Sequence, residues 1–282
     1  MTPRLRRRRR LQLDALLVHA LLLALAALIL LPFYWMVVAS TLDLPQIVRY
    51  PPRLYPGTSL GRNVRDLLAL LPFVRAFRNS LLVSGTVTFS QLFLCSLAGY
   101  AFAKYDFPGR ERLFILLLAT MMIPSAVGLV PWYVMMNWFH WVDSYKALIV
   151  PGMVSAFGIF WMRQYTTQSV PDELVQAARI DGCSDFGTYW RVALPIVLPG
   201  MGALGIISFM GVWNDYLPPL IILRNVQKFT LPLVVALLAN QFNTRQHLIM
   251  VGSTFATVPV LIVFFLASRR FIAGLTAGAL KE

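Results

Sequence analysis

The stretch Glu173–Pro199, ELVQAARIDGCSDFGTYWRVALPIVLP, is a mixed polar segment between two strongly apolar parts of the chain. It begins with charged and small residues and ends with two prolines, Pro195 and Pro199. The flanking segments, Ala147–Met162 and Gly200–Leu223, carry almost no charge. A polar stretch held between two such segments predicts that the chain crosses a membrane on either side of it.

The composition of the whole chain points the same way. It has 282 residues, of which 58% are hydrophobic and 13% charged, and its mean hydropathy is +0.67. A bilayer core about 30 Å thick needs roughly 20 apolar residues of helix to cross it. Six segments meet or approach this requirement: Ala15–Ser40, Ser80–Ala103, Leu113–Met136, Ala147–Met162, Gly200–Leu223 and Leu248–Ser268. The sequence therefore predicts an all-α, polytopic membrane protein with six transmembrane helices.

Three of these segments depart from a plain apolar run. Ala15–Ser40 follows a basic start, but it is longer than the roughly 7 to 15 residues of a signal peptide, so we expect a retained first helix. Pro124 and Pro131 predict a kink in the third segment. The fourth segment is short, and we expect Lys146 and Arg163 to extend their charges from its ends to the interface.

The distribution of Lys and Arg predicts the orientation. Six spans place both termini on one side, which then carries fifteen Lys and Arg against ten on the other. Because cytoplasmic loops are enriched in these residues, we expect a cytoplasmic tail 1–14, a transmembrane domain 15–271 with a cytoplasmic loop 168–199, and a cytoplasmic tail 272–282. The net charge of +13 is attributed to anionic lipid headgroups rather than to nucleic acid.

The loop 168–199 has the pattern of a helix-turn-helix. Ser169 is expected to cap the first helix, with Pro171 and two acids in its first turn. The helix should run to about Asp181, where Gly182 supplies a stop. At ~1.5 Å per residue it is too short to span a bilayer.

The second helix should begin at Ser184–Asp185 and end where Pro195 and Pro199 interrupt the pattern before the fifth span. Its apolar residues recur at helical spacing: Phe186, Tyr189, Trp190, Ala193 and Leu194. One interpretation of the pair is an interfacial anchor for a long loop. The other is a docking element for a protein groove, since Leu174, Ala177 and Ala178 form a small apolar stripe whose alanines let another surface approach the backbone closely.

The run Leu174–Gly182, LVQAARIDG, with the prolines downstream, resembles the EAA loop of ABC importer permeases. More narrowly, it is similar to the carbohydrate-uptake branch of the maltose permease G type. The resemblance covers roughly Pro72–Glu282. It includes Asn79-Ser80-Leu, AGYAFAK at Ala98–Lys104, Met122-Ile-Pro124, WNDY at Trp213–Tyr216 and the tail from Arg270 to Lys281.

The resemblance implies that the first helix is a coupling helix, which docks in a cleft of an ATP-hydrolysing subunit. The residues implied in this contact are Glu173, Gln176, Ala177, Ala178, Arg179, Asp181 and Gly182. Gln176 stands where the family usually has Glu, so it offers a hydrogen bond without charge-assisted strength. We therefore expect docking through the alanines and the backbone, with Glu173 or Asp181 supplying the negative charge.

The chain has no Gly-x4-Gly-Lys-Ser/Thr loop, so we do not expect it to be an enzyme that binds ATP itself or to need a cofactor. The resemblance implies a second permease subunit, two ATPase subunits and an extracytoplasmic solute-binding protein in a bacterial or archaeal plasma membrane. It also implies that the tail Gly274–Glu282 reaches the ATPases; a frayed terminus is the alternative. Two rival functions are a membrane scaffold that docks a partner and an ion-coupled secondary carrier.

Asp215 is the one acid within a predicted span, some 22 Å from the cytoplasmic entry. An ionisable residue inside a membrane is a functional candidate, and Trp213, Asn214 and Tyr216 are expected to share a carbohydrate path with it. The alternative is that Asn214 and Asp215 cap the helix or bond to a neighbouring span. The sequence does not name the carbohydrate.

Two outer loops remain, Leu42–Phe77 and Arg224–His247. Each is a candidate surface for the solute-binding protein, and solvated loops are the alternative. The arginines of the first loop would also suit an anionic substrate such as a sugar phosphate. Cys95 and Cys183 are too far apart in the predicted topology to pair, and neither has the spacing of a metal site.

Overall fold

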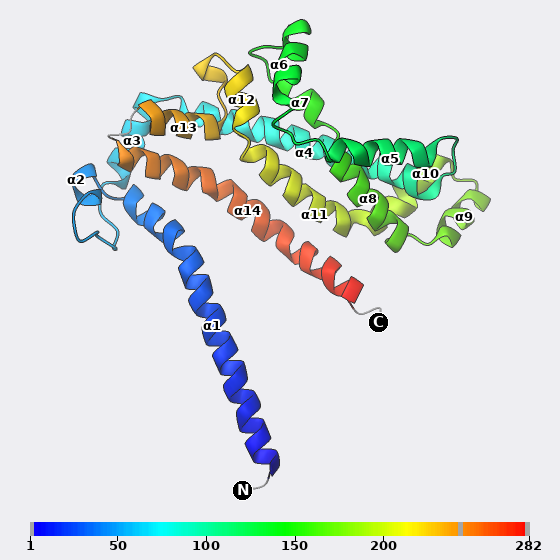
Figure 1. Ribbon diagram of the computed structural model, residues 1–282, viewed down its shortest axis with the longest axis horizontal. Helices are drawn as coiled ribbons and strands as arrows, with labels where there is room; N and C mark the ends of the chain where they lie inside the picture. The colour runs from blue at the N-terminus through cyan, green and yellow to red at the C-terminus, as the bar shows by residue number, and fades with distance from the viewer. Residues whose placement is uncertain (1–2, 242–244, 280–282) are drawn as a thin grey trace. The chain divides into compact units, whose positions relative to one another are not determined.

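The computed structural model describes the backbone of residues 3–241 and 245–279 and the side chains of residues 15–241 and 245–266. Within these limits the chain is helical and holds no strand (Figure 1). The helices are α1 (Pro3–Ser40), α2 (Leu44–Ile47), α3 (Leu60–Leu70), α4 (Phe73–Lys104), α5 (Arg110–Met121), α6 (Leu129–Trp138), α7 (Lys146–Gly152), α8 (Ala156–Ser169), α9 (Asp172–Ile180), α10 (Asp185–Thr188), the π-helical turn Tyr189–Ala193, α11 (Leu194–Trp213), α12 (Leu217–Ile222), a 3-10 turn Val226–Lys228, α13 (Leu231–Gln241) and α14 (Gln246–Ala279).

Five helical stretches of the described chain are long and apolar enough to cross a membrane: Ala15–Ser40, Phe73–Lys104, Lys146–Ser169, Asp185–Ile222 and Gln246–Leu266. They coincide with five of the six predicted spans. The predicted all-α, polytopic membrane class is therefore confirmed.

The third predicted span, Leu113–Met136, is divided into α5 and α6 instead of forming one kinked helix. The helix ends because Pro124 has no N–H to donate and disfavours helical backbone at the residue before it. Pro131 causes no break, since it lies in the first turn of α6, where the backbone N–H groups have no partner within the helix.

The described residues among 1–71 and 237–255 form one compact unit, and those among 72–236 and 256–282 form another. The prediction that both tails lie in the cytoplasm rests largely on basic residues whose side chains are outside the described part of the structure: Arg4, Arg6–Arg10, Arg269, Arg270 and Lys281.

In the first unit, the loop that follows α1 is held by internal contacts. Asn63, which is buried in α3, donates to the carbonyl oxygens of Ser40 at 2.9 Å and Leu42 at 2.7 Å. Arg62 lies 3.6 Å from Asp43. Arg53 stacks over the Tyr55 ring at 4.2 Å. Part of the arginine-rich loop therefore packs on itself.

In the second unit, α4 packs along α8 and α11 (Figure 1). Two glycines allow helices to approach closely, Gly99 between α4 and α8 and Gly200 between α11 and α8. A Cβ at Gly99 would lie 2.6 Å from the Met162 Cβ, and one at Gly200 would lie 2.5 Å from the Tyr165 ring. Small residues of this kind bring helix backbones together in membrane proteins.

Gln91 joins α4 to α7 and α11. Its amide nitrogen donates to the Gly152 carbonyl oxygen at 2.7 Å, and its amide oxygen accepts from the Ser208 hydroxyl at 2.6 Å. Interhelical hydrogen bonds of this type stabilise a bundle where water is absent.

Candidate functional site

The predicted coupling helix is α9, and its end is built as the sequence indicates. Gly182 has a φ of +82°, a left-handed conformation that glycine adopts without strain. The Gly182 N–H donates to the Arg179 carbonyl oxygen at 3.1 Å, and the Cys183 N–H donates to the Ala178 carbonyl oxygen at 2.9 Å. This pair of bonds is a Schellman motif, so the predicted glycine stop is confirmed.

The start of α9 differs from the prediction. Ser169 is the last residue of α8 and does not cap α9. The N-cap residue is Pro171, which makes no side-chain cap. Asp172 and Glu173 occupy the first turn, where negative charge is favoured by the helix dipole.

The second predicted helix begins where expected but does not end there. Ser184 caps α10 by accepting from the Gly187 N–H at 3.1 Å. The chain then passes through the π-helical turn Tyr189–Ala193 into α11 without a break. In this turn the Leu194 N–H reaches back to the Tyr189 carbonyl oxygen. The wider turn accommodates Pro195, which has no N–H to donate, so the second helix is continuous with the fifth span.

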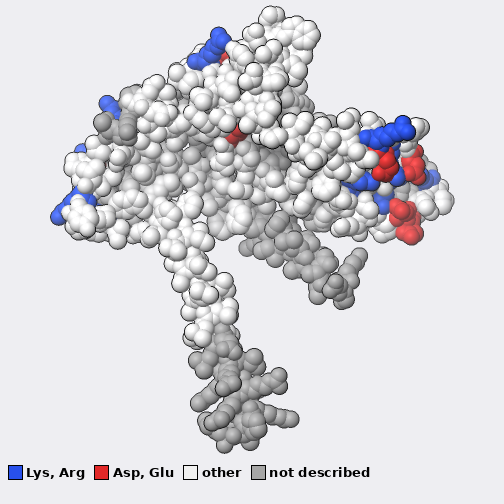
Figure 2. All heavy atoms as spheres, in the orientation of Figure 1, with Lys and Arg blue, Asp and Glu red and all other residues white. Residues whose placement is uncertain are grey.

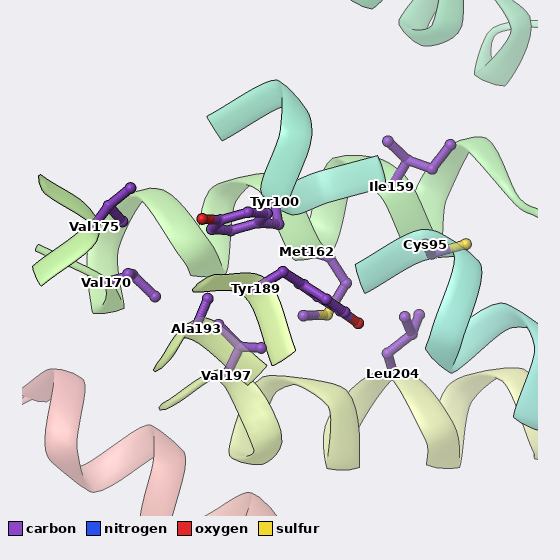
Figure 3. Close-up of a cluster of buried hydrophobic side chains, with 10 residues drawn as sticks. All are labelled: Cys95, Tyr100, Ile159, Met162, Val170, Val175, Tyr189, Ala193, Val197 and Leu204. Atoms are coloured by element: carbon purple, nitrogen blue, oxygen red, sulfur yellow. The ribbon is translucent and has the colours of Figure 1, made fainter. Parts of the chain in front are cut away.

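The two faces of α9 have different environments. Val175 and Ala178 are buried, at 4% and 6% exposure. Val175 belongs to a core cluster at the Lys104 end of α4, which includes Tyr100, Val170 and Tyr189 (Figure 3). The predicted stripe is therefore divided, because Ala178 turns inward.

The remaining predicted coupling residues are exposed: Glu173, Gln176, Ala177, Arg179, Asp181 and Gly182. Leu174 and Ile180 complete this outer face, and Ile180 is 86% exposed. Sequence reasoning did not single out Ile180, although its spacing of three residues from Ala177 places both on one side of the helix. Figure 2 shows that charged side chains gather over the end of the second unit formed by α5, α9 and α10.

Two contacts fasten the coupling segment to α4. The Tyr189 hydroxyl lies 2.8 Å from the Ser96 hydroxyl, and both residues are buried. Lys104 forms an ion pair with Asp172, and the Lys104 side chain is only 5% exposed. Sequence reasoning missed these roles for Lys104 and Tyr189, because their partners are distant in the chain.

Beside this ion pair lies a polar recess of about 430 Å³ between the end of α4 and α9. Arg179 belongs to it and stacks over the Tyr105 ring at 5.0 Å. Gln176 also lines the recess. Gln176 and Arg179 therefore face the junction between α9 and α4 as well as solvent.

The predicted carbohydrate path is brought together only in part. Asp215 lines a cavity of about 340 Å³ whose walls come from α4, α6, α7 and α12. Trp213 is buried, donates to the Ala256 carbonyl oxygen at 3.0 Å and packs edge-on against Phe77. It is a packing residue.

The neighbours of Asp215 also have local partners. The Asn214 amide nitrogen donates to the Met210 carbonyl oxygen at 2.9 Å, which caps α11 as the alternative interpretation proposed. Tyr216 packs against the cluster of Met136, Ile222 and Leu223. Among the four predicted path residues, Asp215 is thus the one that lines the cavity.

At the other end of α4, Asp143 holds the loop between α12 and α13. Its carboxylate accepts from the backbone N–H groups of Arg224 and Asn225 at 3.0 and 3.1 Å, and from the Lys228 Nζ at 2.8 Å. Lys228 also donates to the Asp143 carbonyl oxygen at 2.6 Å. Burial raises the pKa of Asp143, but the hydrogen bonds from Lys228, Arg224 and Asn225 outweigh burial and lower the pKa to about 2.

The same loop is fixed to the start of α4. The Asn79 amide nitrogen donates to the carbonyl oxygens of Gln227 and Phe229, each at 3.0 Å. The Ser80 hydroxyl accepts from the Leu231 N–H at 2.7 Å. We call residues 223–230, held in this way, the clamped loop. It lies at the Asn79 end of α4, and α9 lies at the Lys104 end.

Comparison with known proteins identifies the family. Residues 95–276 match the model of the binding-protein-dependent transport system inner membrane component. The chain is 38% identical over 209 residues to the arabinooligosaccharides transport system permease protein AraQ of Bacillus subtilis (strain 168), covering 74% of each chain. It is 33% identical over 275 residues to the lactose transport system permease protein LacG of Rhizobium radiobacter, covering 98% of each.

The fold agrees with a solved structure. A bacterial ABC transporter involved in the import of the acidic polysaccharide alginate superposes with a TM-score of 0.80, covering 92% of this chain and 97% of that one at 20% identity. The chain therefore belongs to the binding-protein-dependent inner membrane transport components, as a multi-pass permease of the carbohydrate-uptake branch of ABC importers.

Proposed function

We propose that this permease subunit moves a carbohydrate into the cell and that partner ATPases drive it through α9. The observation that carries the proposal is the attachment of α9. Its outer face is free for a partner, and its first turn is tied to α4 through the Lys104–Asp172 ion pair. The Ser96–Tyr189 hydrogen bond ties the π-helical turn that follows α10 to the same helix. A push on α9 is therefore a push on a helix that crosses the bilayer.

α4 is long enough to carry that movement across the membrane. Its 32 residues give a length of roughly 48 Å at about 1.5 Å per residue. The side chains of Gln91 and Ser96 connect it to α11 and to the coupling segment. Since packed interfaces shift between discrete arrangements, a displacement at one end can bias the whole unit between two states.

The docking contact is proposed to use Ala177, Ile180 and the exposed acids Glu173 and Asp181. Ala177 lets a partner approach the backbone, and Ile180 offers apolar surface. Gln176 lacks the charge of the usual family residue, so Glu173 or Asp181 supplies the attraction to a cation of the ATPase. ATP hydrolysis is then carried out by the partner subunits alone.

The orientation follows from the coupling role. If α9 faces the cytoplasm, the clamped loop at the other end of α4 faces outward. We propose that it receives an extracytoplasmic solute-binding protein. A related solved transporter, with a TM-score of 0.65, is a bacterial alginate ABC transporter in complex with alginate pentasaccharide-bound periplasmic protein, which supports a partner of this kind. A second permease subunit completes the proposed assembly.

Purification from the native membrane tests the proposal against its rivals. An importer subunit should co-purify with an ATPase, and hydrolysis should rise when loaded solute-binding protein is added. A scaffold would hold the ATPase without this stimulation. An ion-coupled carrier would transport in vesicles that contain this chain alone and an ion gradient.

A further inference from the structure

The second unit contains two apolar clusters, one toward each end of α4. The first is the cluster at the Lys104 end, whose buried residues come mainly from α4, α8, the coupling segment and α11 (Figure 3). The second takes buried residues from α6, α7, α12 and α13. It also contains Phe229, whose carbonyl oxygen accepts from Asn79, so it lies toward the Asn79 end. We call them the Lys104-end cluster and the Asn79-end cluster.

Three spans are interrupted between these clusters. The third span places α5 against the Lys104-end cluster through Leu117, and α6 in the Asn79-end cluster through Met136. The fourth and fifth spans divide in the same way, into α8 and α7 and into α11 and α12. The interruptions lie at residues 122–128, 153–155 and 214–216, whereas α4 is continuous and contacts both α7 and α8. Short segments at the ends of helices are where two packed bodies move relative to each other.

The interruption in the fourth span, at residues 153–155, is supported by side chains. Because α7 ends at Gly152, its last carbonyl groups have no partner within the helix. The Gly152 carbonyl oxygen accepts instead from the Gln91 Nε2 of α4 at 2.7 Å. The Ser155 hydroxyl caps α8 by accepting from the Gly158 N–H at 2.9 Å. Non-helical backbone at membrane depth is tolerated where such partners replace the helical ones.

Gln91 also bonds to the fifth span. Its amide oxygen accepts from the Ser208 hydroxyl of α11 at 2.6 Å, and both residues are buried. One side chain therefore links α7, which belongs to the Asn79-end cluster, to α11, which belongs to the Lys104-end cluster. At ~1.5 Å per residue, Gln91 lies about 20 Å from Lys104, near the middle of α4.

Close packing holds both flanks of the interruption against α4. A Cβ built at Gly152 would lie 3.2 Å from the Val87 Cγ1, and one built at Gly158 would lie 2.8 Å from the Cys95 Sγ. Val87, Gln91 and Cys95 follow one another at intervals of four residues, which places them on one face of α4. The interruption therefore rests on a single stripe of α4, with Gln91 at the centre of that stripe.

We propose that residues 153–155 form a hinge between the two clusters and that Gln91 fixes this hinge in one conformation. A displacement of α9 then reaches α7 and the clamped loop instead of being absorbed at the hinge, and a displacement of the clamped loop reaches α9 in the same way. Gln91 is thus a positioning residue for transport. The inference rests on the proposed coupling through α9 and deepens it by naming the residue that carries movement across the interruption.

Two spin-label distances in the purified complex test the hinge. One joins Lys146→Cys of α7 to Gln164→Cys of α8, across the interruption, and the matched control joins Gln164→Cys to Leu198→Cys of α11. All three positions are exposed. The background is Cys183→Ser, since Cys183 is partly exposed, with partner subunits free of reactive cysteines. Gln91→Leu should broaden the distance distribution across the interruption and leave the control distribution unchanged.

The unlabelled variants are then reconstituted in vesicles, and ATP hydrolysis is measured with and without the solute-binding protein, purified with its natural ligand bound. Gln91→Leu should lower the stimulated rate several-fold and the basal rate far less, because the signal from the clamped loop has to cross the hinge to reach α9. Ser84→Ala is the control, since Ser84 is buried and its hydroxyl donates within α4 to the Ser80 carbonyl oxygen at 2.7 Å. It should change neither the distances nor the stimulation.

Ser208→Ala provides a second variant if Gln91→Leu does not fold. It keeps the bond from Gln91 to Gly152 and removes the bond to α11, so both effects should appear to a smaller extent. The inference requires both effects. An unchanged distance distribution across the interruption would overturn it, and so would a broadened distribution with normal stimulation.

A lower unfolding temperature in Gln91→Leu with neither effect would show that Gln91 only packs the bundle, which also overturns the inference. Failure of the proposed function has a different signature, because it appears in the unaltered complex as absence of an ATPase or of stimulation by the binding protein. An unaltered complex that responds normally, beside a Gln91→Leu variant that responds equally well, refutes the role of Gln91 alone.

Discussion

The Tyr189 hydroxyl and the Ser96 hydroxyl lie 2.8 Å apart in the core of the second unit. Ser96 also donates to the Phe93 carbonyl oxygen at 3.0 Å, so its own proton is used within α4. Tyr189 is then the donor of the shared bond. Removal of the donor and removal of the acceptor should therefore cost different amounts of stability, although both break the same contact.

Ser96→Ala should therefore destabilise the protein more than Tyr189→Phe. Tyr189→Phe removes one hydrogen bond but leaves Ser96 bonded to Phe93, at a cost of about 1 kcal/mol. Ser96→Ala leaves the buried Tyr189 hydroxyl without an acceptor, at a cost of about 1 to 3 kcal/mol. Thermal unfolding of the detergent-solubilised complex measures both. The reverse order would contradict the assigned donor.

The Lys104–Asp172 pair should show a second asymmetry, because Lys104 is buried and Asp172 is 73% exposed. Lys104→Met leaves an acid in water, which costs about 1 kcal/mol or less. Asp172→Asn leaves a buried ammonium without its counter-ion, and should lower the unfolding temperature more. The double variant should recover part of that loss, since the unpaired charge is gone.

Both single variants should also reduce the amount of sugar transported per ATP hydrolysed, because α9 is less firmly attached to α4. Asp106→Asn is the control, since Asp106 is 95% exposed and pairs with Arg110, and not with Lys104. If the variants unfold at a lower temperature but transport the same amount of sugar per ATP hydrolysed, the ion pair stabilises the fold and has no part in coupling.

Asp143→Asn should loosen the clamped loop. Asn tolerates the left-handed backbone that Asp143 adopts at a φ of +58°, so the change removes the charge with little backbone strain. Hydrogen exchange at the Arg224 and Asn225 amides should rise, and stimulation of ATP hydrolysis by the solute-binding protein should fall. Unchanged exchange would show that Asn79 and Ser80 suffice to hold the loop.

The clamp should also have a defined pH dependence. The pKa of Asp143 is lowered from 3.8 to about 2, so the folded state favours the carboxylate. Its contribution to stability is full above about pH 4 and is lost as the pH falls toward 2. After correction for intrinsic exchange rates, hydrogen exchange at the Arg224 and Asn225 amides should not change between pH 5 and 8. A change in exchange centred near pH 6 would have to come from a group other than Asp143.

Gly182→Ala should destabilise the turn by about 1 to 2 kcal/mol, because a side chain is strained at a φ of +82°. Gly182→Asn should cost less, since Asn is more tolerant of this conformation. No other atom lies within 4 Å of a Cβ built at Gly182, so the expected loss comes from the backbone. Equal unfolding temperatures for the two variants would contradict this cause.

Local chemistry made part of the site predictable from sequence. Gly182 ends α9 and Ser184 begins α10 because each meets a backbone requirement within a few residues. The inward turn of Ala178 was not predictable in the same way, since it depends on the side from which Val170 and Tyr189 pack. The paired roles of Lys104 and Asp172 join residues far apart in the chain, and no local pattern indicates them.

The effect of each proline in the predicted spans was also only partly predictable from the sequence. Pro124 interrupts a helix and Pro131 does not, because the position of each proline relative to a helix start decides its effect. Pro195 was expected to end a helix, but the π-helical turn before it lets the helix continue. The number and apolar character of most spans followed from composition and length, which are insensitive to such details.

Coupling of the ATPases to the membrane helices through α9 is tested most directly by disulfide or bifunctional crosslinking from α9 in native membranes. Ala177→Cys and Ala178→Cys are compared in the Cys183→Ser background, because these adjacent alanines differ in burial. If partner ATPases act through α9, Ala177→Cys captures an ATPase subunit from the cytoplasmic side and Ala178→Cys does not. Capture at neither position, or labelling of Ala177→Cys from outside the cell, would contradict it.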